Sequence, residues 1–394
     1  MIMKEKITAV LGLAALILLA MTCLDKSKNP LEKAAKEFKD SRTPTAADSL
    51  TLQKTNNRLA FRMLRHLYVG QKQDTKLLFS PLGLSYALAM TNYGAEGTTK
   101  QEINSVLGYS NAEQMRALHH EMILSGAYKG TGGEKQQRST LEAEQSLISN
   151  GTFDFRKDFV DNAREYYFAD FKKKENAPSA FPITIRSRLN FTGIWASPFN
   201  PQETQLRTFT NGEGVKRQVK MMQQYYNKLR FADCKGYGMV EIPYTGGFKM
   251  YVLLPGKSLS LGDLVLRTDA ESWRKDVAKL REHSVSLQLP RMDVSTRYDF
   301  NNMLASLGMP TAFTPQADFS GMTTDAHLQI GQVLQESTLK ATESKTEAQS
   351  TTTVGMVLVD LKDQALPIEF YCDRPFLYII TDKYGAINFV GTYC

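Results

Sequence analysis

The chain has 394 residues, of which 42% are hydrophobic and 10% aromatic, so it can bury a large core as one big domain or two medium ones. Its formal net charge is +7, but the basic residues are scattered, and no zinc, helix-turn-helix or RNA-binding signature accompanies them. This pattern predicts a solvated basic surface and argues against nucleic acid as a partner.

The N-terminus is typical of an export signal. Lys4 and Lys6 precede an apolar run at residues 9–21, which is shorter than the apolar stretch that a membrane-spanning helix requires. Cys23 follows the run and resembles the lipidated cysteine of a bacterial lipoprotein, although the residues before it are bulkier than usual. The alternative is a plain secretory signal with a chance cysteine.

These features predict three parts of the chain. Residues 1–22 are expected to be a signal peptide, and residues 23–50, rich in Lys, Asp, Ser and Thr, a lipid-anchored flexible tether. Residues 51–394 are expected to form the folded domain. The predicted location is the outer membrane, facing the periplasm or the cell surface, with secretion as the alternative; the lipid would be the only membrane contact.

The start of the folded domain is predicted to be helical. Apolar residues at 52–67 recur at helical spacing, and residues 76–81 form a short strand that ends in a helix start. Ser80 is suited to cap this helix and Pro81 to its first turn. The helix that follows is apolar on most sides, which predicts burial, and another runs from residue 98 to near 108.

Strands dominate the later part of the chain. After a loop with four glycines at 126–139, strands are predicted at 231–239, 248–255, 284–290, 368–370, 376–381 and 387–390. Gly246-Gly247 and Tyr384-Gly385 mark turns. Because regular strand–helix–strand alternation is absent, we predict the α+β class with a large, mostly antiparallel or mixed sheet.

The cysteines and histidines show no metal-binding or catalytic pattern. No CxxC pair is present, His119-His120-Glu121 lacks the second histidine of the H-E-x-x-H zinc motif, and no G-x-S-x-G, P-loop or G-x-G-x-x-G occurs. We therefore expect no metal, no cofactor and no enzymatic activity. The spacing of Cys234, Cys372 and Cys394 assigns no disulfide.

Five segments match those of a known protein family in their residues, their order and their spacing. They are LFSPLGLSYALAM at 78–90, GAEGTT at 94–99, NFTGIW at 190–195, LGM with ADFSGM at 307–322, and DRPFL at 373–377. Together they resemble the serpin family of protease inhibitors. The resemblance implies a monomer with the serpin fold: a large mixed central sheet, additional sheets, a mostly helical N-terminal part and an exposed reactive loop at about 344–370.

The resemblance also implies a suicide-substrate mechanism. A serine or cysteine protease cleaves the loop and is held as an acyl-enzyme, while the freed loop inserts into the main sheet as a new strand. The intact fold is strained relative to the inserted one, and this difference drives trapping.

Insertion requires alternate side chains to face the core. From residue 346 onward one face is small or apolar, namely Thr346, Ala348, Ser350, Thr352, Val354, Met356 and Leu358. Glu347 lies on the other face. The predicted hinge is Glu343, Lys345, Thr346, Glu347, Ala348 and Ser350. The alternative is a Ser/Thr-rich linker in which this alternation of side chains arises by chance. Lys345 stands where inhibitory serpins usually have Gly, whose backbone is more flexible.

The family's distance from hinge to scissile bond places that bond at Val359-Asp360. Because the segment up to Pro375 is a few residues longer than the family norm, Met356, Leu358 and Lys362 are alternatives. Val359 suits an elastase-like protease with a small apolar pocket, which we favour as the target, whereas Lys362 suits a trypsin-like one.

One stretch departs from the family. Between Phe171 and Arg188 lie only sixteen residues, where the family places a whole helix that crosses the front of the main sheet. We predict that this helix is missing. Its absence and Lys345 favour an alternative function, a non-inhibitory binding or chaperone-like lipoprotein on the same fold, whereas the sorted hinge favours the inhibitor.

Overall fold

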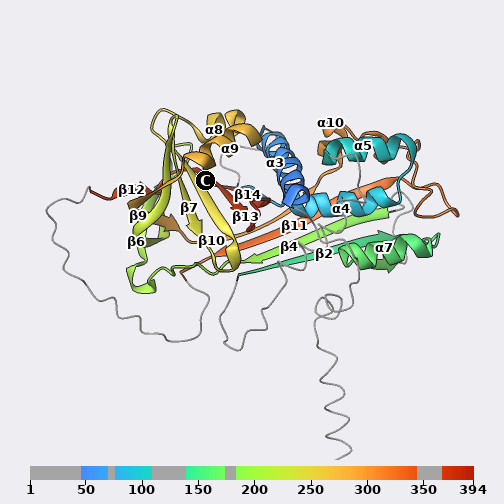
Figure 1. The fold of residues 1–394 in the computed structure, drawn as a ribbon, viewed down its shortest axis with the longest axis horizontal. Helices are drawn as coiled ribbons and strands as arrows, with labels where there is room; N and C mark the ends of the chain where they lie inside the picture. The colour runs from blue at the N-terminus through green and yellow to red at the C-terminus, as the bar shows by residue number, and fades with distance from the viewer. Residues whose placement is uncertain (1–45, 70–75, 109–138, 174–182, 344–365) are drawn as a thin grey trace, which may run out of the picture. The chain divides into compact units, whose positions relative to one another are not determined.

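Two β-sheets and a set of helices make up the described part of the chain (Figure 1). The computed structural model describes residues 46–69, 76–108, 139–173, 183–343 and 366–394. All of them belong to one compact unit, Arg42–Cys394. The predicted signal peptide, most of the tether and Cys23 lie outside the described residues.

The smaller sheet has five strands in the order β10-β11-β4-β2-β3. Its strands are β2 (Thr140–Ser149), β3 (Asp170–Lys173), β4 (Ile183–Thr192), β10 (Met292–Asp299) and β11 (Ile330–Ala341). β11 pairs with β4 and β2 with β3 in parallel, whereas β10–β11 and β2–β4 are antiparallel. The predicted mixed sheet is confirmed.

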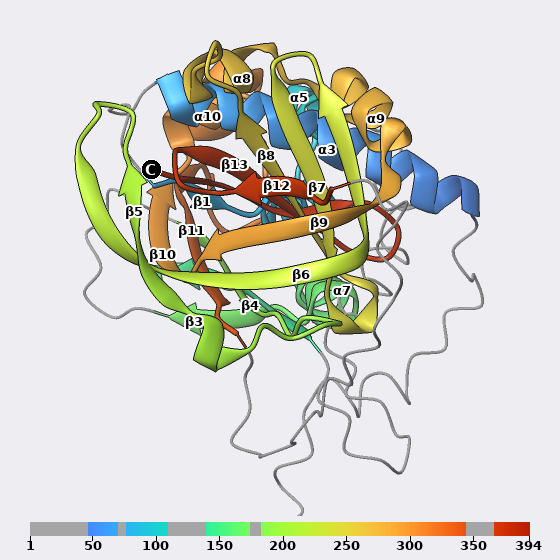
Figure 2. The same cartoon turned by 90° about the vertical axis from the view of Figure 1, so that its left-hand side faces the viewer.

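The larger sheet has nine strands in the order β1-β14-β13-β8-β7-β6-β9-β12, with β5 paired to β6. They are β1 (Leu78–Phe79), β5 (Gln205–Thr210), β6 (Lys216–Cys234), β7 (Tyr237–Pro243), β8 (Lys249–Pro255), β9 (Arg281–Pro290), β12 (Ile368–Tyr371), β13 (Phe376–Thr381) and β14 (Ile387–Tyr393). Figure 2 shows the long β6 curving beside β9, with β12 on the far side of β9.

The helices gather mainly near the N-terminal part of the chain, as predicted. They are α3 (Ala46–Val69), α4 (Pro81–Tyr93), α5 (Gly97–Leu107), α7 (Lys157–Tyr167), α8 (Leu261–Arg267), α9 (Ala270–Lys279) and α10 (Asn301–Leu307). α3 begins at Ala46, inside the stretch expected to be tether. Among the described helices, none is long and apolar enough to cross a membrane.

α4 is the helix that supports the five-stranded sheet. The Ser80 hydroxyl accepts the Gly83 backbone N–H, as expected of an N-cap, and Pro81 occupies the first turn. The helix is buried from Pro81 to Asn92, because it lies between the sheets, at β4 and β14, and the helices α3 and α5 (Figure 1). The predicted buried helix is confirmed.

The strand predicted at 231–239 is wrong, because the chain reverses there. β6 ends at Cys234 and β7 begins at Tyr237, so the two form a hairpin. Gly236 adopts a φ of +84°, a left-handed conformation that glycine enters without strain. The Lys235-Gly236 pair between two apolar runs was the available turn signal.

The stretch predicted to lack a helix is only partly described. Residues 172–173 belong to β3 and residues 183–187 to β4, and the nine residues between lie outside the described ranges. Lys173 and Ile183 are both register partners of Ser149, on opposite sides of β2. Because neighbouring strands lie about 4.8 Å apart, these two residues are separated by only about 10 Å.

Cys234, Cys372 and Cys394 are each buried as free thiols. Burial raises the pKa of Cys234 to about 11 and raises that of Cys372 further. Neither thiol is therefore a thiolate at neutral pH, and both act as small apolar residues in the core.

Candidate functional site

The pairing of β4 with β11 lies in the middle of the five-stranded sheet. We call this parallel ladder, which runs from Ile183 opposite Ile330 to Thr192 opposite Lys340, the β4–β11 seam. Burial alternates strictly along β4. Its back face is buried against the helices, whereas its front face is polar and half-buried: Thr184, Arg186, Arg188, Asn190 and Thr192.

The first turn of α4 holds both strands from behind. On β11, the Gln335 amide nitrogen donates to the Ser80 carbonyl oxygen at 2.8 Å, and the Gln335 amide oxygen accepts the Ser80 backbone N–H at 2.7 Å. On β4, the Ser187 hydroxyl donates to the Gly83 carbonyl oxygen at 3.2 Å. A Cβ at Gly83 would collide with Leu189, so glycine permits this close approach. One helix end thus bridges the seam.

A buried tryptophan closes the end of the seam where β11 stops. The Trp195 indole Nε1 donates to the carbonyl oxygen of Thr342 at 2.7 Å. Trp195 is only 1% exposed and stacks on Tyr244, with ring centroids 4.1 Å apart. Because Trp195 follows β4 and Thr342 follows β11, the bond ties the two strands where the chain leaves the sheet.

Glu343 is the one predicted hinge residue within the described ranges, and it is firmly held. Its carboxylate accepts from Arg291 Nε and Nη2, each at 2.7 Å, and from the Thr204 hydroxyl. Burial raises the pKa of Glu343, but these hydrogen bonds outweigh it and hold the pKa below its ordinary value. Since Arg291 lies between β9 and β10 and Thr204 precedes β5, Glu343 fastens one sheet to the other.

The chain from 344 to 365 connects the two sheets. It leaves the five-stranded sheet after Glu343 and returns at β12, on the edge of the nine-stranded sheet, where Ile368–Tyr371 pair in parallel with β9. The remaining predicted site residues all lie in this segment, outside the described residues: Lys345, Thr346, Glu347, Ala348, Ser350, Met356, Leu358, Val359, Asp360 and Lys362.

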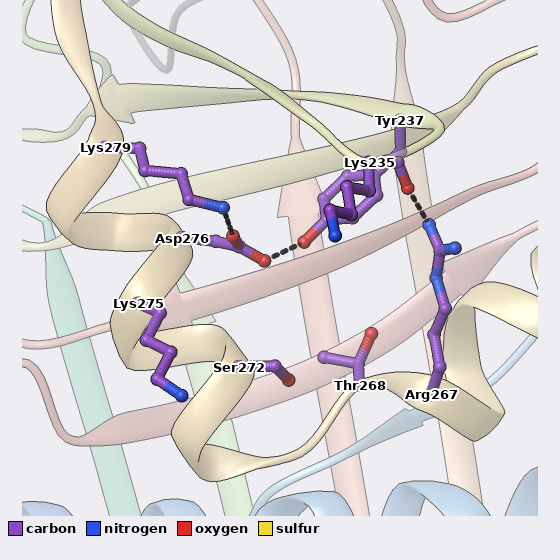
Figure 3. A pocket seen from close by; sticks show the side chains of 8 residues that line it. All are labelled: Lys235, Tyr237, Arg267, Thr268, Ser272, Lys275, Asp276 and Lys279. Carbon is purple, nitrogen blue, oxygen red and sulfur yellow. Dashed lines mark hydrogen bonds and ion pairs between the residues drawn. The ribbon is translucent and has the colours of Figure 1, made fainter.

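A separate pocket of about 280 Å³ lies beside α9 and the β6–β7 turn (Figure 3). Its cations are Lys235, Arg267, Lys275 and Lys279. Lys279 pairs with Asp276 at 2.6 Å, Lys275 pairs with Glu271 at 2.7 Å, and Arg267 donates to the Lys235 carbonyl oxygen. Since three of the four cations are already engaged, we assign this pocket to the packing of α9 and not to a ligand.

The sequence analysis did not predict three residues of the seam, namely Gln335, Arg188 and Glu336. It also missed Arg291, the partner of Glu343. Trp195 did lie in a segment that carried the family resemblance. The alternation of apolar and polar residues at 183–192 was a usable signal for β4, because it is typical of a strand with one buried face.

Comparisons with known proteins agree with this geometry. The family model described as "Serpin (serine protease inhibitor)" matches residues 54–180 and 178–394. Human Serpin B4 is 26% identical over 395 residues, covering 87% of this chain and 99% of that protein. Iripin-2 of Ixodes ricinus is 28% identical over 378 residues, covering 88% and 94%.

Solved structures share the fold. The structure of human thyroxine-binding globulin superposes on this chain with a TM-score of 0.76 at 20% identity, covering 88% of this chain and 98% of that one.

The anchoring of Glu343 predicts how stability depends on pH. Arg291→Gln leaves a carboxylate that is only 5% exposed without its cation. Because Arg291 is 36% exposed and water screens part of the pairing, the substitution should lower the free energy of unfolding by about 1–3 kcal/mol at pH 7. Because the folded pKa of Glu343 lies below the unfolded one, its contribution is present above the unfolded pKa and lost as pH falls through the folded pKa.

Thermal unfolding at pH 7 and in acid measures this effect. The melting-temperature gap between wild type and Arg291→Gln should narrow below about pH 4.5. Arg156→Gln, which breaks the exposed pair with Asp158, is the matched control and should leave the melting temperature unchanged. Equal melting temperatures for Arg291→Gln and wild type at pH 7 would contradict the anchoring role.

Proposed function

Since the chain belongs to the serpin family, we propose that it is a protease inhibitor that acts as a suicide substrate. Members of this family are mostly protease inhibitors and not catalysts, although some do not inhibit. One observation carries the proposal for this chain. The β4–β11 seam is closed, and the segment expected to bear the bait bond begins directly at its end, after Glu343.

Strand direction supports insertion at the seam. A segment that reverses after β11 and enters the sheet beside it runs antiparallel to β11, and therefore also antiparallel to β4. Insertion would thus replace one parallel pairing by two antiparallel ones, which are more stable per residue. The closed sheet has a more favourable arrangement available, which is the free-energy source that the mechanism needs.

We propose the inserted face and the bait bond from the sequence pattern. Thr346, Ala348 and Ser350 would face the core, Glu347 would face solvent, and Lys345 would lie in the turn. The proposed bond is Val359-Asp360, and Met356, Leu358 and Lys362 remain alternative cleavage positions. Val359, on the N-terminal side of this bond, is small and apolar, which favours an elastase-like serine protease as the target.

The short connection between β3 and β4 supports the missing front helix. It has nine residues and joins two strands that flank Ser149. A helix of ordinary length, about 10–14 residues with a connection at each end, needs more chain. The polar front face of β4 is also unlike the apolar surface on which a helix packs.

Lys345 supports one alternative, a non-inhibitory serpin that binds another molecule. A lysine in place of glycine makes the reversal after β11 stiffer, and slow insertion allows the protease to finish cleavage and leave. We favour the inhibitor because small or apolar side chains alternate with others after Lys345. A loop that never becomes buried in a sheet does not need this alternation.

A panel of elastase-, trypsin-, subtilisin- and papain-like proteases tests the proposal. We expect gel-stable complexes with at least one of them, and mass spectrometry of the released C-terminal peptide to identify the bond. Thr346→Arg would bury a charge on insertion and should abolish the complex while cleavage continues. Glu347→Arg, with opposite parity, is the matched control and should still form it.

Either of two results would contradict this account. Cleavage without any stable complex across the panel would remove the inhibitor proposal. A stable complex with Thr346→Arg, or its loss with Glu347→Arg, would overturn the assigned face.

We also propose that the chain is exported and lipidated at Cys23, on the strength of the basic residues, the apolar run and the cysteine that follows it. In the producing cell, labelled fatty acid should enter the wild-type protein, which should sediment with membranes. Cys23→Ser should take up no label and leave the membrane fraction. Equal labelling of both proteins would exclude Cys23 as the lipid site.

A further inference from the structure

A row of four charges with alternating sign crosses the front of the five-stranded sheet. It consists of Glu144 on β2, Arg188 on β4, Glu336 on β11 and Arg297 on β10. The strand registers place Glu144 opposite Arg188, Arg188 opposite Glu336, and Glu336 opposite Arg297. Directly opposed side chains are the ones that interact most strongly across a sheet. We call this set the charge row.

The contact in the middle of the charge row is the best formed. Arg188 donates from Nε and Nη2 to one carboxylate oxygen of Glu336, at 3.1 and 3.0 Å. Arg188 Nη1 also donates to Glu144 at 3.2 Å, while Arg297 Nε lies 3.9 Å from Glu336. Glu336 is sheltered, with 25% of its side chain exposed. Two donors, a sheltered acceptor and flanking charges distinguish this pair from an isolated surface pair.

This middle contact is also the one ionic contact that spans the seam on its front face within the described residues. The other front-face pairs of the seam are Thr184–Gln332, Arg186–Leu334, Asn190–Thr338 and Thr192–Lys340. None of them joins opposite charges. A new strand between β4 and β11 would increase the strand separation from about 4.8 Å to about twice that value. The contact between Arg188 and Glu336 is therefore lost whenever the seam opens.

We propose that the charge row is an electrostatic clasp that sets how fast a strand enters the seam and makes that rate depend on ionic strength. The proposal rests on the proposed function, because it presumes insertion. The clasp must open before an incoming strand forms its own hydrogen bonds, so it adds to the barrier. Salt screens partly exposed charges, so insertion should be slower at low ionic strength than at high.

Uptake of a synthetic peptide with the sequence of residues 346–357 measures insertion without a protease. The intact protein is incubated with the peptide at about 0.01 M and about 1 M salt, where the screening lengths differ about tenfold. The rate is followed on native gels and by the gain in melting temperature. Arg188→Gln, Glu336→Gln and the double variant remove the clasp while nearly preserving side-chain size, and circular dichroism confirms that each is folded.

At low salt, each single variant should take up the peptide about 2- to 5-fold faster than wild type. The double variant should be no faster than either single one, because both changes remove the same contact. At high salt, wild type should approach the variants. Lys275→Gln is the control: its pair with Glu271, at 2.7 Å, lies within α9 and outside the five-stranded sheet, so the rate of this variant should equal that of wild type.

Two outcomes would overturn the clasp and are distinguishable. Uptake by all proteins at equal rates, with equal salt dependence, would exclude the clasp and leave the inhibitor proposal standing. No uptake and no stabilisation in any protein would show that the seam does not accept a strand, and the proposed function would fail with the clasp.

Discussion

The rest of the structure depends on one pairing, the parallel ladder between β4 and β11. Each strand has a second neighbour, β2 for β4 and β10 for β11, so the seam lies inside the sheet and not at an edge. To open the seam, the hydrogen bonds of this ladder must break while the two parts of the sheet, β10–β11 and β4–β2–β3, move apart. Under the proposed mechanism, the strength of this ladder decides whether the chain stays in its closed form or accepts another strand.

Three different kinds of contact hold the seam. Behind it, Gln335 and Ser187 bond to the first turn of α4; at its end, Trp195 bonds to Thr342; in front, Arg188 pairs with Glu336. The first two join uncharged groups, so salt does not screen them, whereas the third is a partly exposed ion pair. Under the proposed mechanism, this third contact makes opening of the seam depend on ionic strength.

Local chemistry made part of this fold predictable. Ser80 and Pro81 predict the start of α4. The apolar runs at 248–255 and 376–381 and the alternating residues 284–290 predict strands of the larger sheet. The seam contacts were out of reach, because Arg188 and Glu336 are 148 residues apart and meet only through the registers of β4 and β11. The same holds for the partner of Glu343: this residue was predicted to belong to the hinge, but its cation, Arg291, comes from the junction of the two sheets. The hairpin at Gly236 was missed because apolar residues continue on both sides of the turn.

The melting temperature of the loop-cleaved protein tests the central claim most directly, because it asks whether the seam accepts the freed strand. The protein is cut once within residues 344–365, the cut is verified by mass spectrometry, and thermal unfolding is compared with that of the intact chain. Replacing a parallel pairing by two antiparallel ones should add several kcal/mol, which at about 2–4 °C per kcal/mol predicts a rise of about 10 °C or more. An unchanged or lower melting temperature would contradict insertion at the β4–β11 seam.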